Sequence, residues 1–211
     1  MREVLKTDGR KPDESVIGKA ASILQAGGVI AYPTETFYGL GADAQNEEAV
    51  KKIFMIKGRN FRNPLSIIIG DTREVKGLVE DVPASALDLM ERFWPGALTI
   101  IFRARKELSG LLTAGTGKIG IRLSSHPVAT ALARKLGRPI TATSANLSGG
   151  PECTAALQVA EEIGDRIDAI VDGGNTPGGV GSTIIDVTAD SPVILREGTI
   201  TKDELNSARA R

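Results

Sequence analysis

The 211-residue sequence contains a single cysteine, Cys153, and a single histidine, His126. One cysteine excludes an internal disulfide framework and a zinc cluster built from cysteines. One histidine beside one cysteine leaves too few ligands for a typical transition-metal site. His126 precedes Pro127 and no G-x-S-x-G motif accompanies it, so we interpret it as a helix-start residue and not as a member of a catalytic triad. Any catalysis must therefore depend on lysine, arginine, hydroxyl groups, backbone amides or a magnesium ion.

The chain also lacks an excess of either charge, because 26 lysines and arginines balance 26 aspartates and glutamates. This balance argues against a protein that holds duplex nucleic acid through bulk electrostatics. Aromatic residues make up 4% of the chain and offer little surface for stacking bases. No apolar run approaches the ~20 residues of a membrane span, and the first sixteen residues lack a secretory signal. We therefore expect a cytoplasmic protein with no membrane partner.

Apolar periodicity predicts helices and strands in alternation. Several strands follow one another without a helix between them, which favours a mixed sheet over a purely parallel one. Because no repeat or linker interrupts the pattern, we expect one α/β domain over residues 1–211, with helices flanking an open sheet. The predicted helices are 13–26, 47–58, 83–93, 127–137, 154–164 and 201–209. The predicted strands are 29–36 (running into a loop), 65–69, 94–102 (after a turn), 118–123, 139–143, 169–171, 183–187 and 192–196.

Polar and glycine-rich segments follow the predicted strands, where α/β proteins usually bind ligands. Two familiar nucleotide motifs are absent from them. The segment GTGKIG (115–120) matches G-x-G-x-x-G but precedes a strand, whereas the dinucleotide motif follows one. The segment GGNTPGG (173–179) has the spacing of the two P-loop glycines but has Gly179 where the P-loop requires lysine. The segments are 33–44, 57–64, 113–118, 143–150 and 172–183.

Cations gather in one of these segments, and two further arginines lie in predicted strands. Lys57, Arg59 and Arg62 lie at the end of a predicted helix and lead into a buried strand. Three cations there suit a polyphosphate, although cations near a helix C-terminus are favourable by themselves. Arg122 lies inside the apolar strand IGIRL and needs a partner or an edge position, and a carboxylate or phosphate ligand would supply a partner. Arg196, after PVIL, raises the same question.

The segment SANLSGG (144–150) ends the predicted strand PITAT with hydroxyl, amide and glycine residues. Such residues dominate ordinary tight turns for local steric reasons. They also build nests of N–H and hydroxyl groups around an anion. The loop alone leaves both interpretations open.

Six segments resemble, in this order, the L-threonylcarbamoyladenylate synthases of the YrdC/TsaC family: AYPTETFYGLGADA, KIFMIKGRNFRNPLSI, WPGALTIIF, IGIRLSSHPVATAL, ITATSANLSGG and GVGSTIIDV…VILREG. The resemblance covers residues 12–203. Its hallmark is the pair of motifs K-x-R and S-x-N, here Lys57/Arg59 and Ser144/Asn146. The resemblance implies a YrdC-like fold, with a twisted open sheet and a large concave surface.

The resemblance also implies an enzyme that converts L-threonine, bicarbonate and ATP to threonylcarbamoyl-AMP and pyrophosphate, with Mg²⁺. A separate transferase would then use the product to modify an adenosine of certain tRNAs. The family's catalytic residues correspond to Lys57, Arg59, Ser144 and Asn146. Its ATP-binding residues correspond to these four with Lys118 and Arg196, and its L-threonine-binding residues to Thr34, Arg122, Ala142 and Ser182. No side-chain metal ligand is expected.

The chain departs from the family pattern in three respects. Longer members carry a linker and a second domain after the position of TKDELNSARAR, so we expect any lid function of that linker to be missing or supplied otherwise. Some members have a histidine at the position of Ile68, and some a small hydroxyl residue at that of Lys118. Two alternatives remain: a YciO-like paralogue with weak or different activity, and a module that binds tRNA or double-stranded RNA through phosphate contacts.

Overall fold

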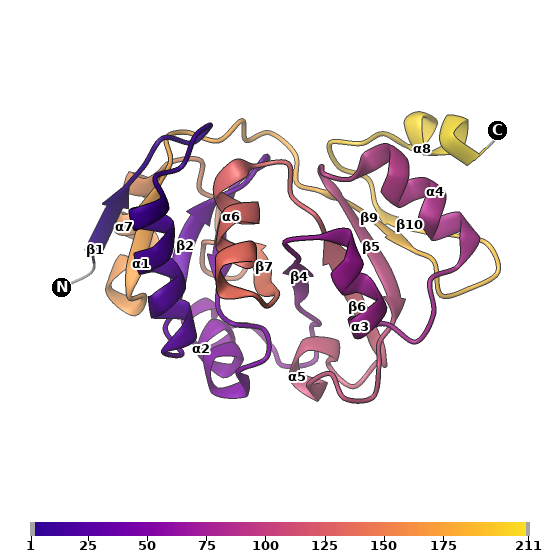
Figure 1. Cartoon of the computed structure of the whole chain (residues 1–211), viewed down its shortest axis with the longest axis horizontal. Coiled ribbons are helices and arrows are strands. Elements are labelled where there is room, and N and C mark those ends of the chain that lie inside the picture. Colours follow the sequence, from indigo (N-terminus) through magenta and orange to yellow (C-terminus); the bar gives the residue numbers. More distant parts are fainter. Residues whose placement is uncertain (1–2, 210–211) are drawn as a thin grey trace.

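The computed structural model describes residues 3–209, which form a mixed ten-stranded sheet with helices on both faces (Figure 1). The expected fold class is confirmed. The expectation of one domain over residues 1–211 includes residues 1, 2, 210 and 211, which lie outside the described part. In spatial order the strands are β1 (Glu3–Lys6), β8 (Ala169–Asp172), β2 (Ile30–Pro33), β3 (Tyr38–Gly41), β7 (Ile140–Ser144), β4 (Ser66–Ile68), β6 (Lys118–Arg122), β5 (Leu98–Arg103), β9 (Thr183–Asp186) and β10 (Val193–Arg196).

Two helices cover one face of the sheet. They are α1 (Glu14–Gln25) and α6 (Pro127–Leu136), which pack side by side on β2 (Figure 1). The smaller hydrophobic cluster lies between them and the sheet and contains Leu24, Leu132 and Tyr32. Because side chains alternate along a strand, Ile30 and Tyr32 enter this cluster while the neighbouring Ala31 enters the larger one.

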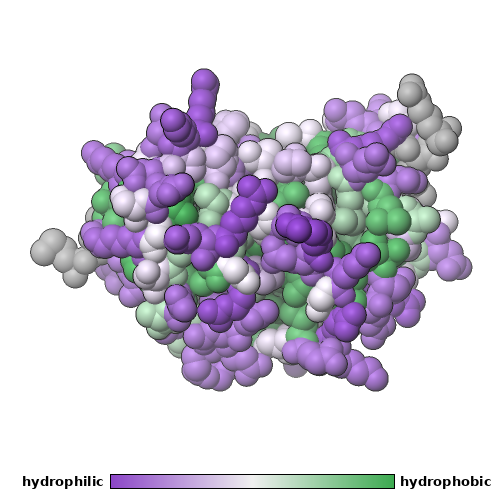
Figure 2. All heavy atoms as spheres, viewed as in Figure 1, coloured by the Kyte–Doolittle hydropathy of each residue, from purple (hydrophilic) through white to green (hydrophobic). Residues whose placement is uncertain are grey.

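The other helices contribute to the larger cluster, which contains Phe54, Ile100 and Leu205. Figure 2 shows hydrophilic side chains over much of the face that carries α1 and α6. Within residues 3–209, no helix is both long and apolar enough to cross a membrane. The remaining helices are α2 (Glu47–Lys57), α3 (Val75–Leu78), α4 (Ala84–Phe93), α5 (Gly110–Thr113), α7 (Ala156–Ile163) and α8 (Lys202–Arg209), with short 3₁₀ turns η1 (Thr72–Glu74) and η2 (Gly164–Arg166).

Local signals in the sequence explain where the main helices begin and end. Asn46 Oδ1 accepts a hydrogen bond from Ala49 N at 3.1 Å and caps α2, which ends at Gly58 in the left-handed conformation (φ 59°). His126 Nδ1 accepts a bond from Val128 N at 3.3 Å, and Pro127 occupies the first turn of α6. The interpretation of His126 as a helix-start residue is confirmed.

Two strands were not predicted. The strand β3 lies in the segment 33–44, which we expected to be a loop, and the predicted strand 29–36 ends at Pro33. The glycines of β3 concealed it, because they lower strand propensity. They are needed there, since a Cβ atom at Gly39 or Gly41 would lie 3.0 Å or 2.7 Å from the ring of Tyr32. The strand β1 is short and pairs with β8, about 165 residues later.

The packing of α6 on the sheet leads to a stability prediction. Leu132 is fully buried in the smaller cluster, and we expect Leu132→Ala to cost about 3 kcal/mol of unfolding free energy. For a chain of this size this lowers Tm by roughly 6–12 °C, which calorimetry can measure. Leu157→Ala on α7 is the matched control, because Leu157 is 68% exposed and its loss should shift Tm by less than about 2 °C. Equal shifts for both variants would contradict this packing.

Candidate active site

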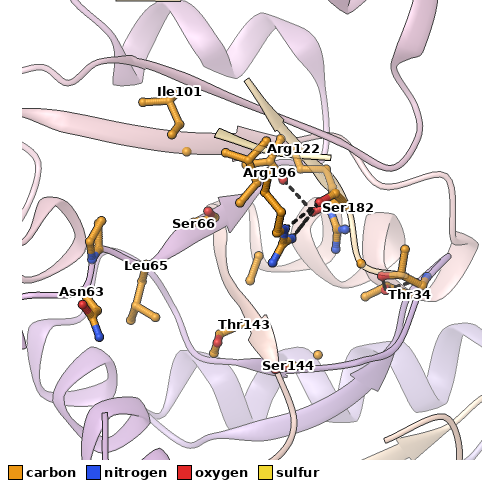
Figure 3. A pocket seen from close by; sticks show the side chains of 18 of the residues that line it. Thr34, Asn63, Leu65, Ser66, Ile101, Arg122, Thr143, Ser144, Ser182 and Arg196 are labelled. Carbon is orange, nitrogen blue, oxygen red and sulfur yellow. Dashed lines mark hydrogen bonds between the residues drawn. The ribbon is translucent and has the colours of Figure 1, made fainter. Parts of the chain in front are cut away.

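A cavity of about 700 Å³ lies beside the central strands (Figure 3). Its lining comes from the β2–β3 turn, the segment after α2, and strands β4 to β7, β9 and β10. Lys57 and Asn146 are not part of the lining. The lining includes eight of the ten predicted site residues: Thr34, Arg59, Lys118, Arg122, Ala142, Ser144, Ser182 and Arg196.

Strand register explains how distant residues meet at this cavity. Ser66 on β4 pairs with Ala142 on β7, and because the next residue, Ile67, pairs with Ile121, Ser66 also lies beside Gly120 on β6. Ala142, Ser66 and Gly120 therefore form a row of small residues across the three strands. Along β6, Lys118, Gly120 and Arg122 line the cavity while Ile119 and Ile121 enter the core. Glycine is needed at position 120, because a Cβ atom there would lie 2.6 Å from Ser66 Oγ and would collide with it. The absence of a side chain also keeps this part of the cavity unfilled.

Lys57 ties the segment 144–150 to the end of α2. It is 3% exposed, and its Nζ donates to Ser144 O at 2.5 Å, Asn146 O at 2.7 Å and Asn146 Oδ1 at 3.1 Å. Ser144 Oγ donates to Asn146 Oδ1 at 2.6 Å, and Asn146 Nδ2 donates to Gly150 O at 2.6 Å. Lys57 of the K-x-R motif and the S-x-N motif therefore form one hydrogen-bonded unit, in which Lys57 and Asn146 support a loop whose Ser144 lines the cavity.

Two arginines at the cavity donate hydrogen bonds to backbone carbonyl groups. Arg59 Nη2 donates to Pro64 O at 2.8 Å, and Arg196 Nη2 donates to Ser182 O at 2.7 Å (Figure 3). Burial lowers the pKa of both guanidinium groups, which nevertheless stay charged near neutral pH. The ion pairs found within residues 3–209 include neither arginine. The carbonyl dipoles hold the two guanidinium groups in place without neutralising them, so both positive charges remain available to an anion.

The predicted threonine-binding residues lie together. Figure 3 shows Arg122 near Ser182 and Arg196, with Thr34 on the same side of the cavity. Ser182 Oγ lies 3.1 Å from Thr99 Oγ1 and 3.2 Å from Arg196 Nη2. Thr34 Oγ1 donates to Phe37 O at 2.7 Å. Arg122 lies in an interior strand, and within the protein it is paired with Glu35, whose Oε1 lies 3.5 Å from Nη1; the sequence had predicted a ligand as its partner.

Three acidic residues at or near the cavity were not predicted: Glu35, Glu152 and Asp186. Asp186 Oδ2 accepts from Lys118 Nζ at 2.8 Å, and the hydrogen bond from Lys118 helps to lower the pKa of Asp186 against the effect of burial. Both Asp186 and Glu152 line the cavity. In the sequence, the one sign of a role for Asp186 is its place near the end of the predicted strand TIIDV. Its pairing with Lys118 could not be predicted, because the two residues are 68 positions apart in the chain.

The arrangement suits two kinds of anionic group. Side chains of both charges line the cavity, but cations and hydroxyl groups outnumber the two carboxylates. Planar guanidinium groups on separate walls can hold a carboxylate and phosphates at once. Within residues 3–209, no group of three His, Cys, Asp or Glu side chains is placed to hold a metal ion.

A protein-family model named for Sua5, YciO and YrdC, with the description "telomere recombination", matches residues 22–198. The chain belongs to the Sua5/YciO/YrdC family. The resemblance inferred from the sequence is thereby confirmed. A threonylcarbamoyl-AMP synthase of this family from Bacillus subtilis is 47% identical over 202 residues, which are 95% of this chain and 58% of the relative. A putative threonylcarbamoyl-AMP synthase from Mycobacterium tuberculosis is 35% identical, over 90% of this chain and 87% of the relative.

Solved structures of the family superpose on most of the chain. The Sua5 protein of Pyrococcus abyssi, in complex with L-threonine, has a TM-score of 0.95 and 39% identity, and covers 98% of this chain and 61% of its own. The YciO protein of Escherichia coli has a TM-score of 0.86 and 30% identity, over 94% and 97% of the two chains. The chain spans less than two thirds of the length of the first two curated relatives, 58% and 57%.

The Lys57 site leads to a pH prediction. Burial, with the nearby charge of Arg59, lowers the pKa of Lys57 from 10.5 to about 8. Between these values the unfolded chain holds the proton that the folded chain has lost, so the free energy of unfolding rises with pH. Relative to Lys57→Met, the wild type should gain up to about 1.4 kcal/mol per pH unit between pH 8 and 10. Urea denaturation of both proteins measures this difference. A constant difference would show that the three oxygen acceptors balance the effect of burial, and one that favours the variant as pH rises would show that they outweigh it; either result would contradict the prediction.

Proposed function

We propose that the protein is an L-threonylcarbamoyl-AMP synthase, a nucleotidyltransferase that uses L-threonine, bicarbonate and ATP. The observation that carries the proposal is the cavity, which joins the K-x-R and S-x-N unit to a cluster around Arg122. Relatives named threonylcarbamoyl-AMP synthase, and the L-threonine complex of P. abyssi Sua5, support it.

In this proposal the nucleotide occupies the wall formed by the segment after α2 and the loop 144–150. Arg59 and Lys118 contact the phosphates, and Arg196 reaches them from its place beside Ser182. The Ser144 hydroxyl oxygen can accept a hydrogen bond from the nucleotide while its hydrogen is donated to Asn146. Lys57 and Asn146 contribute by holding the loop in place, since neither lines the cavity. Fixed cations suit the transfer of a phosphorus group, which depends mainly on positioning and charge neutralisation.

L-Threonine occupies the other side. Arg122 receives the carboxylate, and the hydroxyl groups of Thr34 and Ser182 lie where they can bond to the polar groups of the amino acid. Ala142 leaves room beside them. The amine and carbon dioxide derived from bicarbonate form a carbamate, whose oxygen attacks the α-phosphorus of ATP. The bond from that phosphorus to the bridging oxygen breaks, and pyrophosphate leaves with the electron pair.

Magnesium fits this site as a partner of ATP and not as a resident ion. The carboxylates that line the cavity are Glu152 and Asp186, and Asp186 is paired with Lys118. Mg²⁺ is commonly held by one or two carboxylates together with phosphate oxygens. It would supply charge neutralisation on the phosphates.

The product is a mixed anhydride that a second enzyme must consume. We propose that a tRNA threonylcarbamoyl transferase in the cytoplasm is this partner. The YciO structure keeps a second candidate open, because this branch of the family superposes over nearly the whole chain. It is the alternative in which the cavity is retained but the activity is weak or different.

The decisive experiment is pyrophosphate release from ATP by the purified protein with Mg²⁺, in the presence and absence of L-threonine and bicarbonate. Release that requires both supports the proposal. ATP binding without threonine-dependent release favours a YciO-like function. Absence of ATP binding, with salt-sensitive RNA binding, favours the RNA-binding alternative.

The arginines of the segment after α2 offer a matched pair of variants. Arg59 lines the cavity, whereas Arg62 is exposed and lies outside the lining. We expect Arg59→Ala to reduce kcat/KM for pyrophosphate release on the order of a hundredfold, as the loss of one charge-stabilising group often does. Arg62→Ala should stay within about threefold of the wild type. Similar rates for the two variants would refute the role given to Arg59.

A further inference from the structure

Arg122 has a carboxylate behind it that the proposed reaction does not use. Glu35 lies in the turn between β2 and β3, between Thr34 and Thr36, which both line the cavity, whereas Glu35 does not. Its Oε1 lies 3.5 Å from Arg122 Nη1, and the side chains of Glu35 and Arg122 are 13% and 8% exposed. The pair is therefore shielded from solvent and lies in the wall of the cavity.

This pair is ionic but poorly hydrogen-bonded. Charge-assisted N–H···O bonds normally measure about 2.7–2.9 Å, so 3.5 Å is long. Glu35 Oε1 and Arg122 Nε are both buried without a hydrogen-bond partner among the described residues. A buried donor without an acceptor costs free energy. Nε is out of reach of a ligand, but the Nη groups of Arg122 make no short hydrogen bond within residues 3–209, and a ligand carboxylate in the cavity could pair with them.

Glu35 is held from its other side by the segment that starts α6. Ser124 Oγ donates to Glu35 Oε2 and accepts from His126 N at 3.1 Å. Thr130 Oγ1 donates to Ser124 O at 2.7 Å. Ser124 also lines a second cavity of about 690 Å³, beside α1 and α6. The position of Glu35 is consequently set by protein contacts and does not depend on a ligand in the first cavity.

The other cations of the cavity are compensated differently. Arg59 and Arg196 contact carbonyl oxygens, which are dipoles, and Lys118 contacts Asp186, which itself lines the cavity. A ligand can reach Asp186 and compete with it. It cannot displace Glu35, because Glu35 lies outside the lining. A carboxylate bound to Arg122 would therefore share the guanidinium group with Glu35.

We propose that Glu35 is the resident counter-charge of Arg122, a positioning residue that balances the buried guanidinium and limits its affinity for a carboxylate ligand. Loss of one partner of a buried ion pair leaves the other charge uncompensated. Two carboxylates on either side of one guanidinium group repel each other, so Glu35 weakens the binding of the ligand while stabilising the ligand-free protein. That the ligand is L-threonine rests on the proposed function; the pairing of Glu35 with Arg122 does not.

The stability of variants tests the pairing without any ligand. Glu35→Gln keeps the size of the side chain and removes its charge, and we expect Tm to fall by about 5 °C or more. In the double variant Glu35→Gln/Arg122→Met neither buried charge is left unpaired, so at least half of that loss should be recovered. A Glu35→Gln variant that fails to fold, beside a folded double variant, supports the pairing equally. An unchanged Tm for Glu35→Gln, or a double variant no more stable than Glu35→Gln, would overturn it.

Calorimetric titration with L-threonine tests the effect on affinity. Glu35→Gln should bind L-threonine on the order of tenfold more tightly than the wild type, because the repelling charge is gone. L-Threoninamide, which has no carboxylate, should show no such gain. Asp43→Asn is the matched control: Asp43 pairs with Arg138 at 2.6 Å, is buried, and does not line the cavity. It should leave the Kd for L-threonine within twofold of the wild-type value.

The outcomes separate this inference from the proposed function. A merely structural role of Glu35 would weaken the binding of both ligands, and unchanged or weaker binding of L-threonine by Glu35→Gln would overturn the counter-charge role. If the wild type does not bind L-threonine at all, the proposed function fails. The pairing of Glu35 with Arg122 is then tested by the Tm values of the single and double variants alone.

Discussion

The pairing of β7 with its two neighbours is the constraint on which the site depends. This strand is antiparallel to β3 on one side and to β4 on the other, and so joins the two halves of the sheet. Its last residue, Ser144, begins the loop that Lys57 holds at the end of α2. One strand end therefore fixes the position of the predicted nucleotide loop relative to both halves. The cavity forms where these parts meet.

A second constraint on the structure is that each positive charge at the site has a compensating group. Lys57 is surrounded by three oxygen atoms, Arg59 and Arg196 contact carbonyl groups, and Arg122 faces Glu35. Isolated buried cations are strongly unfavourable, so the buried Lys57 and Arg122 need such partners, whereas Arg59 is partly buried and Arg196 is exposed. Lys57, with three oxygen acceptors, supports the fold. Arg59 and Arg196, which donate hydrogen bonds to neutral groups, keep a charge that can bind an anion.

The sequence predicted the alternation of helices and strands well where periodicity and caps are strong, as around Asn46 and His126. It missed β3, because Gly39 and Gly41 look like loop residues until the ring of Tyr32 is seen to fill the space beside them. Most of the candidate site was also predictable, since the family motifs point to residues such as Arg59, Arg122 and Ser182. Glu35 and Asp186 were not, because their partners lie 87 and 68 positions away in the chain, and local pattern carries no signal of such contacts.

The sequence by itself determined which chemistry is open to this protein: with one cysteine and one histidine, it offers cations, hydroxyl groups and amides. It also determined the family, through paired motifs whose residues are close in the chain. Only the tertiary structure decided that Lys57 and Asn146 support the loop from behind while Ser144 reaches the cavity. The reason is that solvent exposure and charge pairing depend on strand register between distant segments, and a linear pattern of residue types does not contain that register.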